Sequence, residues 1–504
     1  MSTIKVLLKV KSTAMKIVYN TLVFLLLVIS SVDGQAYNAE WLFGYDDGQQ
    51  TEEIYGGTIL SFGKDTVYSR YQEIDFFLYT NAQINNKEGQ LILVTEGCSL
   101  FDGEMNKVHA GFLGDYNRAV YLYCDLYERA YPTPQGVIIL PNLYDDRKFQ
   151  LFRVQSSDSL LYITNAVLSW DISLDDKGNV SLSAHDYLIE DVVMDQFTAT
   201  HHGNGMDWWM IIPRIPSGYY IVRLGREGVE ELKLQEVPNG PVFSYFDNSS
   251  DQSVISPDGS IYVHSSNHQG VWIYDFDRCI GELSNKRNIP ISVDTVNALG
   301  VAISPDNRLL YVSMIDKIVQ YDLKADDIAR SGIIVAEYDG HTAPLPATLS
   351  QMMLAPNDRI IVTSSNSVTE FTQIFKPNER GVACDVRQHS LKLKTLASSN
   401  VPNFPNFRAG RLAGSPCDTL LHTGVQAQTL EKVEVFPNPI RDRFNVRVDQ
   451  GYDHIEVIDI SGKVVYTSTR EDSYEISGMR SGIYSIRLWR DAMIVAIDRI
   501  VVLP

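Results

Sequence analysis

Two apolar runs flank a tight turn in the stretch Val254-Ile255-Ser256-Pro257-Asp258-Gly259-Ser260-Ile261-Tyr262-Val263. Proline sets φ for the second position of a type I turn, aspartate is tolerated at the third, and glycine takes the left-handed position that follows. Two further copies of the turn start at Ser304 and Ala355, 48 and 51 residues after the copy before. The third copy ends in Asn357-Asp358, so its turn is expected to differ. The repeat predicts a series of antiparallel hairpins.

Each copy is followed by a third apolar strand, and residues 197–222 form an upstream unit with similar spacing. A period in the high forties with about four strands is typical of propeller blades rather than of solenoid coils. One blade cannot cover both of its faces, so the units must close into a ring. The strands predict six units between about residues 71 and 393, and a seventh completed near the N-terminus. We therefore expect an all-β chain with a six- to seven-bladed β-propeller.

The Ser-Pro-Asp-Gly turn with its following Tyr-Val strand resembles the YncE/lactonase-like and WD40-like propellers. Residues 202–209 and 401–407 also resemble segments of secreted Bacteroidetes propellers that carry a sorting tail. These resemblances imply a fold and no chemistry, because propellers host many unrelated functions.

Residues 433–504 form a second pattern, in which apolar and polar residues alternate between glycine-containing turns. This pattern predicts a small, immunoglobulin-like antiparallel β-sandwich. Three motifs occur in it, namely Phe436-Pro437-Asn438-Pro439, Asp459-Ile460-Ser461-Gly462-Lys463-Val464-Val465 and Ser481-Gly482-Ile483-Tyr484. They resemble the C-terminal sorting domain of the type IX (Por) secretion system of Bacteroidetes, T9SS type A.

This resemblance implies that the tail is bound by the outer-membrane secretion machinery and that the protein is secreted or held on the cell surface. The sorting-motif residues that it implies are Pro437, Asn438, Pro439, Gly462, Gly482 and Tyr484. An ordinary immunoglobulin-like end domain is the alternative interpretation.

The N-terminus has the pattern of a signal peptide, with Lys16 before an apolar run at residues 21–29 and small residues before Gln35. No later segment is long and apolar enough to cross a membrane, so no span is expected in the mature chain. We predict a signal peptide at 1–34, a propeller at 35–396, a return segment and linker at 397–431, and a sorting domain at 432–504, with export through the periplasm.

The chain carries a net charge of −19 and shows no basic patch, which argues against a nucleic-acid partner. Its five cysteines include no CxxC motif. An exported protein can still form disulfides. Cys384 and Cys417 flank the proline-rich return segment, and we expect them to pair.

The sequence contains no Gly-x-Ser-x-Gly elbow, HExxH motif, P-loop or dinucleotide fingerprint. It therefore predicts no catalytic residues, no cofactor and no metal site. The nearest cluster is His201-His202 with Asp207, but adjacent strand residues point to opposite faces, so we interpret it as structural. Turns that join the second and third strands of a blade share one face of the ring, and we expect a ligand face there with Asn267, His268, Asp316 and Asn366.

Three functional hypotheses follow. The first is a non-enzymatic module that binds an extracellular glycan, protein or peptide. The second is a hydrolase, lyase or lactonase whose acidic or imidazole groups converge at the ring axis. The third is a structural role in the cell-surface layer. Carboxylates or histidines within hydrogen-bond reach at the axis favour the second hypothesis, and an apolar or scattered axis favours the first.

Overall fold

The computed structural model describes residues 36–45, 54–76, 78–127, 130–157, 163–243, 251–291, 299–397, 399, 401–418, 433–448, 451–459, 463–476, 478–490 and 493–503. The predicted signal peptide and Gly462 of the predicted sorting motif lie outside these ranges. The chain divides into two compact units, Met1–Asp418 and Thr419–Pro504. Each unit is described by itself.

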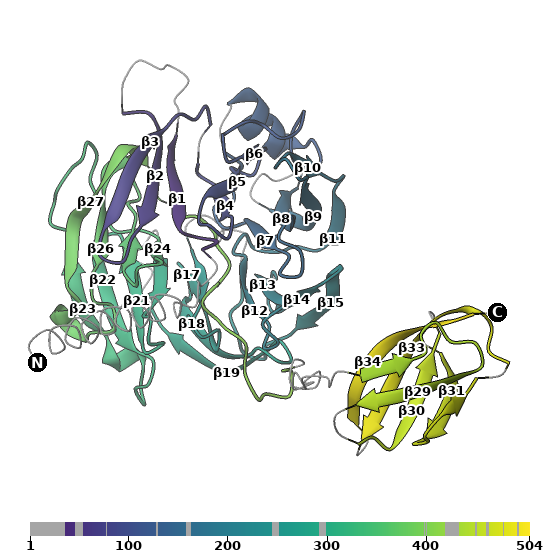
Figure 1. The fold of residues 1–504 in the computed structure, drawn as a ribbon. Coiled ribbons are helices and arrows are strands. Elements are labelled where there is room, and N and C mark those ends of the chain that lie inside the picture. The colour runs from purple at the N-terminus through teal and green to yellow at the C-terminus, as the bar shows by residue number, and fades with distance from the viewer. Residues whose placement is uncertain are drawn as a thin grey trace, which may run out of the picture. The chain divides into compact units, whose positions relative to one another are not determined.

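The described part of the first unit contains seven antiparallel sheets, which stand around a common axis (Figure 1). The first three sheets consist of β1 (Glu40–Tyr45), β2 (Gly56–Phe62) and β3 (Val67–Gln72); β4 (Ala82–Asn85), β5 (Leu91–Thr95) and β6 (Leu100–Asp102); and β7 (Val137–Pro141), β8 (Lys148–Ser156), β9 (Thr164–Leu174), β10 (Val180–Leu182) and β11 (Asp186–Ile189). The unit is a β-propeller, and each sheet is a blade.

The four later blades have four strands each, in sequence order across the sheet. They are β12 (Thr198–His201), β13 (Trp208–Pro213), β14 (Tyr219–Gly225) and β15 (Gly228–Gln235); β16 (Ser253–Ile255), β17 (Ile261–Ser266), β18 (Gly270–Asp277) and β19 (Glu282–Ile289); β20 (Leu299–Ile303), β21 (Leu309–Met314), β22 (Lys317–Asp322) and β23 (Ile333–Glu337); and β24 (Met352–Leu354), β25 (Ile360–Val362), β26 (Val368–Ile374) and β27 (Val386–Ala397). Among the residues that the structure describes, three short helical segments, η1 (Val120–Leu126), η3 (Ala329–Ser331) and η4 (Gly381–Cys384), lie in connections.

The repeated turns join the first and second strands of their blades, as the sequence predicts. The left-handed position is held by Gly259 (φ 78°), Asn307 (φ 61°) and Asp358 (φ 64°). The third copy therefore keeps the same turn, because aspartate tolerates this conformation at its own position. The expectation that its turn differs is wrong.

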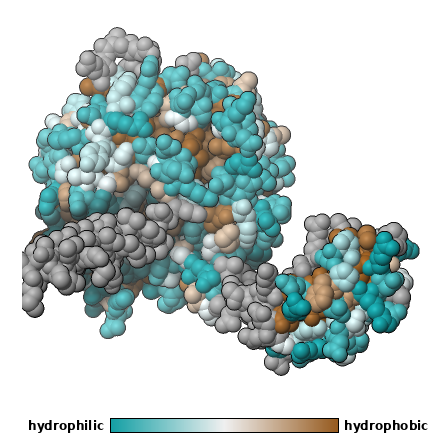
Figure 2. Space-filling model, in the orientation of Figure 1, coloured by the Kyte–Doolittle hydropathy of each residue, from teal (hydrophilic) through white to brown (hydrophobic). Residues whose placement is uncertain are grey.

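The core lies between neighbouring blades, where each sheet buries its faces against the next. Between the fourth and fifth blades, Trp209, Tyr219, Tyr262 and Tyr274 belong to one buried cluster. The hydroxyl groups of Tyr219 and Tyr274 are hydrogen-bonded at 3.2 Å. Hydrophilic residues cover most of the rim on the face shown in Figure 2, and apolar residues are visible toward the centre of the ring.

A segment at 401–418, which we call the crossing segment, follows the last blade and runs along the inner strands of distant blades. The Val401 amide donates to the Gln351 side chain beside β24, and the Asn403 amide donates to the Asn81 carbonyl beside β4. Further on, the Asn406 amide donates to the Ala199 carbonyl in β12. The crossing segment thus joins the seventh and second blades to the fourth.

The predicted disulfide between Cys384 and Cys417 is wrong. Cys417 pairs with Cys279 after β18, Cys98 pairs with Cys124 in η1, and Cys384 is a buried free thiol. The crossing segment carries Cys417 to the fourth and fifth blades, so its partner comes from there. Cys384 instead packs in the apolar cluster between the sixth and seventh blades.

The second unit is an immunoglobulin-like β-sandwich. Its strands are β28 (Val433–Phe436), β29 (Arg443–Val448), β30 (His454–Ile458), β31 (Val464–Thr469), β32 (Tyr474–Glu475), β33 (Gly482–Arg490) and β34 (Met493–Val502). The sheet orders are β28-β29-β32 and β31-β30-β33-β34. Phe444, Ile455, Tyr474 and Leu488 belong to the apolar core between the two sheets.

Candidate functional site

Two glutamine side chains close the ring axis by pairing with the backbone of other blades. Gln135 lies just before β7. Its side-chain oxygen accepts a hydrogen bond from the Ser253 amide at 2.9 Å, and its side-chain nitrogen donates to the Ser253 carbonyl at 2.8 Å. Gln252 lies just before β16 and makes the same pair with Met352, at 3.1 and 2.7 Å. The Gln252 oxygen also receives the Val301 amide at 3.0 Å. These contacts fix the third, fifth, sixth and seventh blades to one another.

The crossing segment fills the axis beside these glutamines. The Asn403 amide group donates to the carbonyls of Gln135, Val137 and Phe197 at 3.2, 2.8 and 3.2 Å. The Asn406 amide group donates to the Ser256 carbonyl at 2.8 Å. Asparagine and glutamine offer both donors and an acceptor, which suits the satisfaction of backbone groups in a buried channel.

A cavity of about 90 Å³ remains at the axis. Drug-sized ligand pockets occupy roughly 300–1,000 Å³, so this cavity is smaller than the pockets that hold such ligands. Its lining contains amide and apolar side chains, and Arg408 is the charged residue in it. No carboxylate or imidazole lines this cavity, so the general acid and base of a hydrolase are absent from it.

The cluster around His201 and His202 is structural. The two rings lie on opposite faces of the strand, with His201 packed on Trp208 and His202 on Trp209. His201 contacts the Ala409 carbonyl at 2.7 Å, and His202 contacts the Cys279 carbonyl at 3.0 Å. Burial lowers the pKa of His201 to about 4, so the ring is neutral at physiological pH.

Asp207 completes that cluster as a buried hub. It receives hydrogen bonds from Tyr144, Asn204 and Arg223 at 2.8, 2.9 and 3.0 Å. Both oxygens of this carboxylate therefore have hydrogen-bond partners, and the group holds the turn before β13 in place. This agrees with the interpretation drawn from the sequence.

The four residues of the predicted ligand face lie on the turns between second and third strands. Asn267 and His268 lie between β17 and β18, Asp316 between β21 and β22, and Asn366 between β25 and β26. His268 and Asp316 are exposed, while Asn267 and Asn366 are half-buried. Asn366 donates to the Pro346 carbonyl at 2.8 Å. The topology thus puts all four on one end of their blades.

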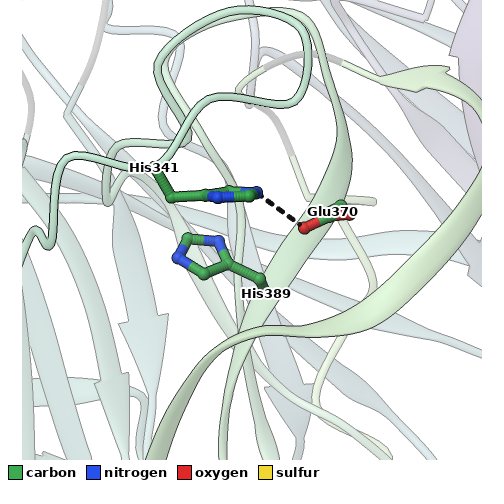
Figure 3. A group of neighbouring side chains, drawn as sticks. All are labelled: His341, Glu370 and His389. Atoms are coloured by element: carbon green, nitrogen blue, oxygen red, sulfur yellow. Dashed lines mark hydrogen bonds and ion pairs between the residues drawn. The ribbon is translucent and has the colours of Figure 1, made fainter.

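A histidine–carboxylate group that the sequence search missed lies at the outer part of the seventh blade (Figure 3). His341 comes from the connection after β23, Glu370 from β26 and His389 from β27. One ligand atom from each residue lies within 4.8 Å of the others. His341 Nε2 is 3.0 Å from Glu370 Oε2, and His389 Nε2 is 2.9 Å from Asp339 Oδ2.

Hydrogen bonding keeps both carboxylates of this group ionised. Burial alone would raise the pKa of Glu370, but hydrogen bonds and charge from Lys392 and His341 outweigh it and lower the pKa. Burial would likewise raise the pKa of Asp339, and the backbone amide of His341 with the His389 ring lowers it. The group therefore offers two anionic carboxylates beside two imidazoles.

Two buried carboxyl groups elsewhere in the propeller have a raised pKa instead of a lowered one. Burial raises the pKa of Glu96, after β5, to about 8. Burial also raises the pKa of Asp195, before β12, to about 8. Each has an oxygen without a hydrogen-bond partner. Burial thus favours the neutral form of both groups.

The family match lies in the second unit. Residues 434–503 match the family described as the secretion system C-terminal sorting domain. The match covers the sandwich alone. The protein is exported by type IX secretion to the cell surface or the extracellular space. No curated protein matches the chain.

Solved structures resemble the chain at low identity. One, assigned as a 6-phosphogluconolactonase from Bacteroides uniformis, is 12% identical, covers 72% of this chain and 98% of its own, and has a TM-score of 0.44. The periplasmic gluconolactonase of Pseudomonas aeruginosa is 10% identical and covers 92% of this chain and 99% of its own, with a TM-score of 0.37. At these values the likeness carries no argument about chemistry. No helix in the described ranges has the length and apolar character needed to cross a membrane.

Proposed function

We propose that the protein is a secreted or surface-held propeller that binds an extracellular glycan, protein or peptide and performs no catalysis at its axis. The observation that carries this proposal is the closed axis. Gln135, Gln252 and the crossing segment occupy the space where convergent catalytic groups would have to stand. The axial cavity is lined by amide side chains and no carboxylate or imidazole, which supports a binding module over a hydrolase.

The turn face with Asn267, His268, Asp316 and Asn366 is the proposed recognition surface. Its side chains are polar and come from three successive blades. The Asn267 side-chain oxygen is buried and has no hydrogen-bond partner, while its backbone amide donates to Asp251 at 3.0 Å. An unpaired buried acceptor is costly, so Asn267 is a position that the fold alone does not satisfy.

The tail and the N-terminus supply export in this proposal. Residues 1–34 direct the chain into the periplasm, and the sandwich presents the sorting motif. Asn438 accepts the Val501 amide at 2.9 Å, and Tyr484 donates to the Arg480 carbonyl at 2.8 Å. These contacts support a role for both residues, with Pro437, Pro439 and Gly482, in shaping the surface that the machinery recognises.

A propeller hydrolase or lactonase is the second candidate. Two of the similar structures are assigned as gluconolactonases, but identity of 10–12% transfers no activity to this chain. The axial cavity lacks an acid–base pair, which leaves the binding function better supported.

The test uses the full exported chain on a printed glycan array and on proteins captured from spent culture medium. His268→Ala, Asp316→Ala and Asn267→Ala should each reduce binding to the captured ligand at least tenfold. Arg330→Ala is the matched control, because Arg330 is 89% exposed and lies in the connection between β22 and β23, at the other end of the blade. Unchanged binding in all three face variants would contradict the proposal.

A further inference from the structure

We propose that His341, Glu370 and His389 bind one divalent transition-metal ion of the zinc class, with Asp339 holding His389 in the orientation that binding needs. Two imidazoles and a carboxylate form a donor set that zinc uses in proteins. This inference does not depend on the proposed ligand face, because no residue is shared between the two.

The distances suit a small ion with little rearrangement. Zinc lies about 2.0–2.2 Å from nitrogen and oxygen ligands, so neighbouring ligand atoms of a tetrahedral site are about 3.3 Å apart. His341 Nε2 and Glu370 Oε2 are 3.0 Å apart, and the three ligand atoms lie within 4.8 Å of one another. Figure 3 shows both rings beside the Glu370 carboxylate, with a nitrogen of His389 directed toward the His341 ring.

The environment of His389 selects the tautomer that a metal requires. Its Nε2 lies 3.1 and 2.9 Å from the two oxygens of Asp339, so the proton belongs on Nε2. Its Nδ1 is buried and has no hydrogen-bond partner. A ligating histidine commonly donates its other N–H to a carboxylate, which orients the ring and raises its basicity. The His341 and His389 rings pack with their centroids 4.0 Å apart, which buries Nδ1 without giving it a hydrogen-bond partner.

The backbone supports this orientation. His389 has φ of 56° within β27, a conformation that few residues other than glycine adopt. It lies where the β26–β27 register shifts between Phe371 and Gln373. Such bulges re-aim a side chain. Here the bulge turns His389 toward Glu370 in β26 and His341 in the connection after β23.

The surrounding charges favour a cation. The Asp339 and Glu370 carboxyl groups each contact one of the two imidazole rings, and Lys392 contacts the second oxygen of Glu370. The Lys392 side chain is 64% exposed and can move with the carboxylate. Lys392 can therefore stay paired with Glu370 Oε1 while Glu370 Oε2 binds the metal. The His341 side chain is 42% exposed, and the fourth coordination position is therefore open to water.

The metal would fasten the connection between the sixth and seventh blades to the outer strands of the seventh. His341 and Asp339 lie in that connection, while Glu370 and His389 lie in β26 and β27. Its binding free energy would appear as stability of the folded state, since the four groups meet only there.

The experiment titrates ZnCl₂ into the metal-free exported chain by calorimetry and repeats the titration with CoCl₂ while recording visible absorption. We expect one ion per chain, the d–d bands of a four-coordinate cobalt site, and a higher Tm with zinc. His389→Ala and His341→Ala should each weaken zinc binding at least a hundredfold. Asp339→Asn should weaken it about tenfold to a hundredfold, as outer carboxylates do.

His185→Ala is the matched control. His185 also contacts an aspartate, Asp115 at 3.3 Å, but belongs to no metal-ligand group in the described part of the chain. Its variant should bind zinc as the unmodified chain does. The proposal is overturned if the unmodified chain takes up no zinc at 100-fold molar excess, or if the His341→Ala/His389→Ala double variant binds zinc as the unmodified chain does.

Discussion

At the scale of single residues, the ring axis is held together by glutamine side chains that hydrogen-bond backbone groups as a peptide unit would. Gln252 reaches from the fifth blade to the seventh and replaces a missing strand partner for Met352. The glutamine amide matches a peptide group in its donor and acceptor, so it completes a ladder across the ring where two inner strands are too far apart to pair. An aliphatic side chain of equal length fills the same space without these bonds.

Gln252→Met should therefore destabilise the propeller by about 2–4 kcal/mol, because the buried Met352 and Val301 backbone groups lose their partners. Chemical denaturation of the exported chain measures this change. Gln388→Met is the control, since Gln388 makes one bond to the Glu337 carbonyl near the surface. Its cost should stay below about 0.5 kcal/mol. Equal stability of the two variants would show that the axial pair contributes nothing.

The buried acids Asp195 and Glu96 predict a stability that falls as the pH rises from about 4 to about 8. Their folded-state pKa values are raised to about 8 from 3.8 and 4.5. An acid whose pKa is raised in the folded state contributes its full stability below its unfolded pKa. This contribution is lost as the pH rises to about 8. The free energy of unfolding should decrease between pH 5 and pH 9.

The Asp195→Asn/Glu96→Gln double variant should flatten this dependence, because its amides do not ionise. Denaturant melts at pH 5, 7 and 9 give the comparison. Asp326→Asn, on the exposed connection after β22, is the control and should leave the slope unchanged. A slope as steep in the double variant as in the unmodified chain would contradict the assignment.

At the scale of elements, the turns could be predicted from the sequence better than the contacts between distant segments. The turns at Gly259 and Asn307 follow from residues within four positions, and the structure confirms their hairpins. Residues 197–222, whose spacing matches these units, likewise form the first three strands of a blade. The π-helical η1 lies in a connection whose sequence has no sustained helical period.

Contacts between distant segments could not be predicted in this way. His341, Glu370 and His389 come from three elements, and no spacing motif links them. The partner of Cys417 depends on the path of the crossing segment, which its asparagines fix through bonds to the third and fourth blades. Without that path, sequence proximity favoured Cys384, which is the wrong partner.

The two disulfides should differ in their effect on stability. The Cys279–Cys417 bond closes a loop with a sequence separation of 138, against 26 for Cys98–Cys124. In the chain-entropy account, the longer loop contributes about 1.5 kcal/mol more. Cys279→Ser/Cys417→Ser should therefore lower the unfolding free energy more than Cys98→Ser/Cys124→Ser, as measured by denaturation under non-reducing conditions. The reverse order would show that local packing, not loop closure, sets these costs.

At the scale of the whole molecule, the two units keep separate cores. The apolar cluster of the sandwich contains residues from Val433 to Val502. The clusters of the propeller use described residues no later than Phe407. No apolar cluster of described residues spans both units. The crossing segment and its disulfide complete the propeller before the sorting domain begins.

Removal of the sorting domain should therefore leave the propeller's own stability unchanged. A chain ending at Asp418 keeps Cys417, Asn403 and Asn406, so the axis and the Cys279–Cys417 bond are intact. Calorimetric melting should show the propeller transition within about 2 °C of that in the full chain, with the sandwich transition missing. A chain ending at Ala397 is the informative comparison, because it keeps β27 but loses the crossing segment. It should melt about 3–5 °C lower, which corresponds to the loss of roughly 2–4 kcal/mol in a domain of nearly 400 residues. If both truncations melted alike, the crossing segment would not close the ring. If the first truncation alone shifted the transition strongly, the units would share stability that their separate cores do not provide.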